Sequence, residues 1–158
     1  MNSNLILALA FGIGVVAGLR ALTAPATVSW AAHLGWIQLA GSHLSWMSSI
    51  ITAVIFTLLA IAEIVNDKLP KTGARTAPPS IVIRMVMGGF AAATLSVGIG
   101  GSPWIGALLG AVGALIGTFG GYYVRTGVVR ALHSPDWPIA LIEDAIAVCG
   151  GLFLASRL

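Results

Sequence analysis

The chain alternates long apolar stretches with a few short polar ones. No Asp, Glu, Lys or Arg occurs within residues 1–19, 21–62 or 85–124. Because a helix needs roughly 20 apolar residues to cross a bilayer, the first stretch can supply one crossing and the other two can supply two each. Residues 137–158 supply one more, although three charged residues lie within them. The pattern predicts an all-α, polytopic transmembrane helical bundle with six crossings, as a single integral membrane domain over residues 1–158.

Turn-forming residues divide these stretches into separate helices. Region 23–40 is the least regular, because Pro25, Gly35 and Gln38 interrupt its apolar pattern. It predicts either a second crossing or a re-entrant segment, and the second alternative would leave five crossings. The polar loop at 66–80 separates the two halves of the chain. The other expected helices cover residues 4–19, 46–65, 81–97 and 104–124, with a last helix that follows Asp136.

A second polar connection is expected at residues 125–135, just before the last helix. Asp136 suits the N-cap position of that helix, and Pro138 suits its first turn. In a bundle of six antiparallel helices, both polar connections lie at the same end.

The composition excludes a soluble enzyme. The 158 residues are 58% hydrophobic and include 20 Gly, whereas only 8% are charged. A soluble domain carries about 25% charged residues, so this chain could not cover its surface with polar groups. Its net charge of +3 comes from scattered residues without a basic run among aromatics, so nucleic acid is not an expected partner.

The sequence predicts no metal site, cofactor or catalytic residue. Its three His lack ligand spacing, and a single Cys excludes most thiolate metal sites. It contains no nucleophile elbow, paired-His zinc motif or nucleotide-binding loop. An enzyme would therefore depend on the carboxylates alone, and we do not expect one.

The distribution of charge predicts the orientation in the membrane. With six crossings, Arg157 is the one cation placed at the far end, and all the other Lys and Arg residues share one end with the acids. The positive-inside rule makes that end cytoplasmic. The first three helices then run opposite to the last three, which is the geometry of a 3+3 inverted repeat, although the two halves share no clear sequence similarity.

Glycines recur on one stripe of the helix expected at 104–124. Small residues at such spacing let another backbone approach closely, either within the bundle or between protomers. A pore or ligand groove along the stripe is the alternative. The stripe consists of Gly106, Gly110, Gly113, Gly117 and Gly120.

Charged residues near the predicted helix ends are the candidate ligand-binding site. Glu63 and Asp67 are four residues apart and share one helix face. Arg84 is placed in the first turn of its helix, where it opposes the macrodipole, so an anionic group should compensate it. The complete candidate set is Arg20, Glu63, Asp67, Lys68, Arg84, Arg125, Glu143 and Asp144.

Two interpretations of these charges remain open. Ionised carboxylates within a membrane helix are costly unless they are paired or face water. They could form a buried ion-pair network that fixes helix packing. Alternatively, the arginines could hold an anionic group in a cytoplasm-facing cavity while Glu63 and Glu143 or Asp144 exchange protons.

The order of these motifs resembles a known family. The elements are Gly18-Leu19-Arg20, then Glu63-x-x-x-Asp67-Lys68-x-Pro70, then Arg84, Arg125 and Glu143-Asp144. They are similar to those of an uncharacterised family of small bacterial integral membrane proteins, a domain of unknown function, over nearly the whole chain. Many members carry a further acid where this chain has Lys71-Thr72-Gly73. The resemblance implies an all-helical fold and the bacterial inner membrane, and it carries no activity.

Three functional hypotheses follow from the sequence. The leading one is a small carrier or flippase for an anionic metabolite or lipid headgroup, which could be linked to proton movement. The alternative is a non-catalytic accessory or structural subunit packed within a larger membrane complex. A lipid-modifying enzyme acting through Glu63 and Glu143 is the third. Membrane lipids and a homo-oligomer or larger complex are the expected partners.

Overall fold

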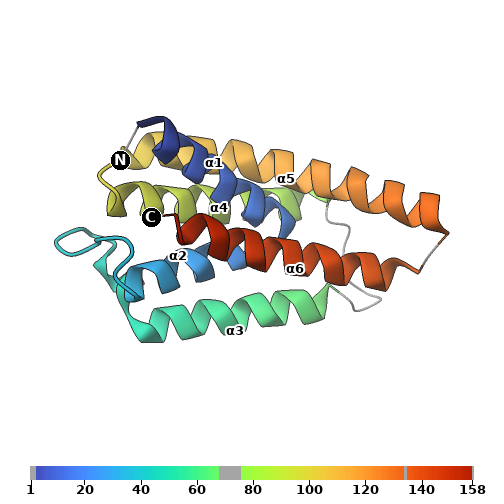
Figure 1. Cartoon of the computed structure of the whole chain (residues 1–158), viewed down its shortest axis with the longest axis horizontal. Coiled ribbons are helices and arrows are strands. Elements are labelled where there is room, and N and C mark those ends of the chain that lie inside the picture. Colours follow the sequence, from blue (N-terminus) through green and yellow to red (C-terminus); the bar gives the residue numbers. More distant parts are fainter. Residues whose placement is uncertain (1–2, 68–75, 134, 158) are drawn as a thin grey trace.

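The computed structural model describes residues 3–67, 76–133 and 135–157. In these ranges it is an all-helical bundle, as the apolar pattern predicts (Figure 1). Its elements are α1 (Ser3–Leu19), α2 (Thr23–His33), the short 3₁₀ helix η1 (Ser45–Ser48), α3 (Ile50–Asn66), α4 (Pro78–Gly98), α5 (Pro103–Leu132) and α6 (Asp136–Ala155).

The helices identify a membrane protein. Three of the described helices, α4, α5 and α6, are long and apolar enough to span a bilayer, and α1 and α3 are shorter apolar helices. Large hydrophobic side chains cover the outer surface: Ile51, Trp104 and Leu108 are each at least 66% exposed. A soluble protein rarely exposes a contiguous apolar surface of this kind, whereas lipid chains would cover it.

Successive helices run in opposite directions along the bundle (Figure 1). α5 packs against both α1 and α4, and these three helices form the tightest part of the molecule. α2 lies among α1, α3, α4 and α6, while α3 packs mainly on α2 and η1 and forms the edge. The two sets of three helices are therefore opposed in direction, but α2 and α5 do not make equivalent contacts.

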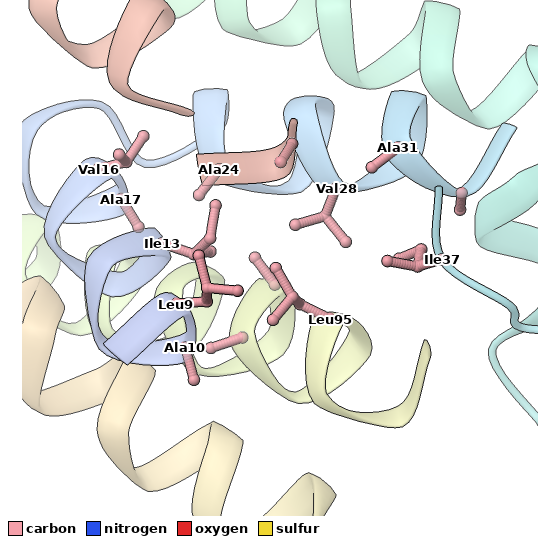
Figure 2. Close-up of a cluster of buried hydrophobic side chains, with 14 of the residues drawn as sticks. Leu9, Ala10, Ile13, Val16, Ala17, Ala24, Val28, Ala31, Ile37 and Leu95 are labelled. Atoms are coloured by element: carbon pink, nitrogen blue, oxygen red, sulfur yellow. The ribbon is translucent and has the colours of Figure 1, made fainter. Parts of the chain in front are cut away.

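The apolar core lies between α1, α2 and α4. Figure 2 shows Leu9 and Ile13 of α1 pointing towards Val28 of α2 and Leu95 of α4, with Ile37 at one edge. Each of these five side chains is at most 3% exposed. Val28 and Ile37, both from the irregular region 23–40, thus contribute to this core.

Region 23–40 contains a shorter helix than a complete crossing requires. α2 ends at His33, and Gly35 then adopts a φ of +78°, a left-handed conformation that favours glycine. The chain continues as irregular backbone, and the Gln38 N–H donates to the Gly98 carbonyl at the far end of α4 (3.0 Å). The segment therefore passes along the bundle as a helix of 11 residues followed by irregular chain, in which Ile37 is buried and Trp36 is exposed.

The polar connection expected at residues 125–135 is mostly helix, so this prediction was wrong. α5 continues to Leu132 and ends where His133 adopts a left-handed φ of 49°. Asp136 is the first residue of α6 and not its N-cap, a position that Pro135 occupies. No proline occurs after Arg125 before Pro135, so the helix can continue, and Arg125 binds the Asp136 carboxylate across the α5–α6 turn.

Candidate functional site

The predicted charged residues meet at one end of the bundle, where α1, α3 and α5 end and α2, α4 and α6 begin (Figure 1). Lys68 lies outside the described residues. We call the seven others the charge network. They are Arg20, Glu63, Asp67, Arg84, Arg125, Glu143 and Asp144. Ion pairs link five of them into one group, and a second pair joins Arg84 to Glu63.

Arg20 is the most deeply buried of these residues. It connects α1 to α2, and its side chain is 0% exposed. Its Nε donates to Asp144 Oδ1 of α6 at 2.5 Å, and its Nη1 lies 2.8 Å from Asp67 Oδ2. Burial alone would lower the pKa of Arg20, but the charges of Asp67 and Asp144 outweigh burial and raise it. The guanidinium therefore stays cationic and joins three parts of the chain.

Arg125 is the second centre of the network. Its Nη1 lies 3.4 Å from Glu143 Oε2 and 3.7 Å from Asp67 Oδ2. Its other two nitrogens bind Asp136: Nε donates to Oδ1 at 2.8 Å, and Nη2 forms an ion pair with Oδ2. Asp67 thus lies between Arg20 and Arg125 and links α3 to both.

Glu63 binds backbone N–H groups as well as a charged side chain. Its two carboxylate oxygens accept hydrogen bonds from the N–H groups of Ala21 and Leu22, each at 2.8 Å. Leu22 is the N-cap residue of α2 and Ala21 directly precedes it, and Leu22 makes no side-chain cap within the described chain. Free N–H groups and the helix dipole make such an end favourable for an anion. The spacing of Glu63 and Asp67 did not reveal this contact, because it depends on α3 lying beside α2.

Arg84 is compensated mainly by carbonyl groups. Its Nη1 donates to the Gly18 and Leu19 carbonyls at 2.7 and 2.8 Å, which are among the last carbonyls of α1. Its Nη2 lies 3.9 Å from Glu63 Oε1. Because α4 begins at Pro78, Arg84 is in the second turn and not the first. The anionic compensation expected for it thus comes from the negative end of the α1 dipole and from Glu63.

The network limits how an anion could bind. Among the described residues, Arg20, Arg84 and Arg125 each lie within 4 Å of at least one carboxylate. An incoming anion would therefore meet a carboxylate of the protein beside each of these arginines and would compete with it for the positive charge.

Four of the five predicted stripe glycines lie where α5 meets α1 and α4. A Cβ on Gly106 or Gly110 would collide with α4, at Ala92 and Gly88 respectively. A Cβ on Gly113 or Gly117 would collide with the α1 backbone. A Cβ on Gly120, in contrast, would meet no atom of the described residues within 4 Å.

A separate cavity of about 290 Å³ lies at the opposite end of the bundle. Its lining is mostly apolar, with Ser3, Ser96 and Ser102 from α1, α4 and the α4–α5 turn. Of the residues that the structure describes, no charged one lines it, so the cavity is distinct from the charge network.

A comparison with models of known protein families identifies the family of this chain. The model of a domain of unknown function, DUF4126, matches residues 7–156. The chain belongs to the DUF4126 family. No curated protein and no solved structure matches this DUF4126 chain.

Proposed function

We propose that the protein is a small membrane carrier or flippase that binds the anionic group of a metabolite or lipid headgroup at the charge network. The observation that carries this proposal is Arg20, a guanidinium with no exposed side-chain surface between carboxylates of α3 and α6. Ionisable residues at such positions in membrane helices are costly, and they commonly mark substrate or proton pathways.

Asp67 supports a link to protons. It lies 2.8 Å from Arg20 and 3.7 Å from Arg125, so one carboxylate attracts two guanidinium groups. Protonation of Asp67 would remove that attraction from both arginines at once. An anion could then pair with either arginine, and release of the proton would favour its departure.

The opposed directions of the two sets of helices fit such a carrier. Many secondary transporters place the substrate between two sets of helices of opposite direction and rock one against the other. Here Arg84 of α4 holds the end of α1, and Arg20 is paired with α6, so the network joins both sets. A change of its ion pairs would alter contacts between the sets.

The proposed location is a bacterial inner membrane with the charged end in the cytoplasm. Arg20, Arg84, Arg125 and Arg130 lie at this end, whereas Arg157 follows α6 at the other. The positive-inside rule supports this orientation. It would expose the network to cytoplasmic anions and to the inner leaflet.

One observation favours the alternative, a non-catalytic subunit of a homo-oligomer or larger membrane complex. Arg84 is used to cap α1 through two carbonyl groups, which is a structural task. A network occupied in this way would fix helix packing and bind nothing else. The outward apolar side chains of α3 and α6 would then serve contacts with other subunits.

Flux in reconstituted proteoliposomes separates these functions. The soluble probes are radiolabelled lactate, succinate and inorganic phosphate, with a pH-sensitive dye inside the vesicles to report proton movement. Fluorescent phosphatidylserine and phosphatidylglycerol test lipid movement. The carrier proposal expects saturable flux of at least one probe by the wild type. Arg125→Lys should reduce it, since lysine cannot reproduce the fork that serves Asp136 and Glu143.

Arg130→Lys is the matched control. Arg130 lies on the same helix and at the same end, but it lies outside the network. Its substitution should leave the flux unchanged. If the folded wild type moves none of the probes, or if both variants respond alike, the carrier proposal fails and the subunit hypothesis takes its place.

A further inference from the structure

The N-terminus of α2 already holds a carboxylate that comes from another helix. Glu63 of α3 offers one oxygen to the N–H of Ala21 and the other to the N–H of Leu22. Consecutive N–H groups with two oxygens in parallel are a bidentate arrangement for a flat, two-oxygen anion. Arg84 Nη2, 3.9 Å from the same carboxylate, adds positive charge.

The same helix end holds polar groups that Glu63 does not use. Thr23, in the first turn of α2, is 3% exposed, and its Oγ1 has no hydrogen-bond partner among the described residues. Arg20, directly before Ala21, is 0% exposed, and its Nη2 likewise has none in that part of the chain. A buried donor without a partner costs about 1 to 3 kcal/mol. Both groups lie at the same end of α2 as the Glu63 carboxylate, and each can make a further hydrogen bond there.

We infer that the anionic group recognised by the proposed carrier is a carboxylate, and that it binds at the α2 N-terminus in place of Glu63. The inference rests on the proposed function, because it names the substrate class of that same site. In this arrangement Glu63 acts as an internal substitute for the substrate: it fills the site in the empty carrier and leaves when the substrate arrives.

Charge favours a carboxylate over a phosphate. A carboxylate that replaces Glu63 leaves the total charge of the site unchanged. A phosphate monoester carries about −1.5 to −2 at neutral pH. A phosphate at the site would add negative charge near three carboxylates of the protein. Asp67 and Asp144 lie on the Arg20 side of the site, and Glu143 lies beyond Arg125. Unscreened like charges at these distances inside a membrane protein are strongly unfavourable.

Rescue of Glu63→Ala by added anions tests this inference. In phosphatidylcholine nanodiscs the variant should melt below the wild type, because two backbone N–H groups lose their acceptor. Acetate or formate should raise its melting temperature saturably, and inorganic phosphate or chloride at equal ionic strength should not. The same salts should change the wild type little, since Glu63 fills the site. If Glu63→Ala does not fold, the melting temperature of Glu63→Gln is measured against acetate concentration instead. Acetate should also displace the neutral amide of Gln from the site.

Ser49→Ala is the matched control, because Ser49 Oγ caps the N-terminus of α3 through the Ile51 N–H in an exposed position. It should lose stability without rescue by acetate. A second series compares nanodiscs that contain phosphatidylserine, which carries a carboxylate, with those that contain phosphatidylglycerol. Rescue by phosphatidylserine assigns the carboxylate to a lipid headgroup, and rescue by acetate alone assigns it to a soluble metabolite.

The outcomes separate this inference from the proposed function. Equal responses to all anions, or no response, overturn the carboxylate site. If the wild type transports phosphate or phosphatidylglycerol but carboxylates do not rescue Glu63→Ala, the carboxylate site is overturned and the carrier proposal stands. Carboxylate rescue in a protein that moves none of the probes keeps the site and overturns the carrier.

Discussion

Arg20 and Asp144, 124 positions apart in the sequence, form a buried ion pair with Nε 2.5 Å from Oδ1. Their side chains are 0% and 9% exposed. The pair joins the α1–α2 junction to α6 at the charged end of the bundle. Because a buried charge is costly when its partner is removed, this contact couples the last helix to the end of the first.

Asp144→Ala should therefore destabilise the protein by about 3 to 5 kcal/mol, as expected when one partner of a buried pair is removed. Reversible unfolding in mixed detergent micelles would measure the change. The double variant Arg20→Met/Asp144→Leu should lose less than the two single variants together, because neither member of this pair is then left without the other. A double variant as unstable as the sum of the two single ones would contradict the coupling of these residues.

Gly110→Ala should lower the thermal stability strongly. A Cβ at this position would overlap the Gly88 backbone of α4 and lie 2.5 Å from the Ala92 Cβ, so the two helices would have to separate. The thermal midpoint in detergent would report the change. Gly120→Ala, on the same helix with no atom of the described residues within 4 Å, should be neutral or slightly stabilising, since alanine favours helix by about 1 kcal/mol. Equal effects at the two positions would show that α5 does not pack against α4 in this way.

Arg84→Gln should loosen the end of α1 before it affects the other helices. The variant loses the guanidinium that binds the Gly18 and Leu19 carbonyls, which lie in the last turn of α1, where hydrogen-bond donors of the same helix run out. Hydrogen–deuterium exchange should show faster exchange in the last turn of α1 and the first turn of α2. Arg130→Gln removes a charge at the same end and should leave this exchange pattern unaltered. Unchanged exchange in Arg84→Gln would argue against the cap.

The sequence determined that this is an all-helical membrane protein, because the free energy of burying apolar residues depends on their number and order along the chain. Uncharged stretches located α1, α3, α4 and the start of α5 within a few residues of their observed bounds. Most of the residues that meet at the charged end could also be predicted, since isolated charges in apolar helices require partners, but the pairing of Asp136 with Arg125 was missed.

Only the tertiary structure decided which charge meets which. Glu63 binds backbone N–H groups of α2, and Arg84 binds backbone carbonyls of α1. No residue pattern encodes these contacts, because every residue carries a backbone carbonyl and almost every one an N–H. Only the structure likewise showed that α5 extends to Leu132 and that Arg125 binds Asp136 across the turn. Local sequence therefore determined where the helices form and which charged residues lie near their ends. The packing of helices distant in sequence determined which groups those charged residues bind.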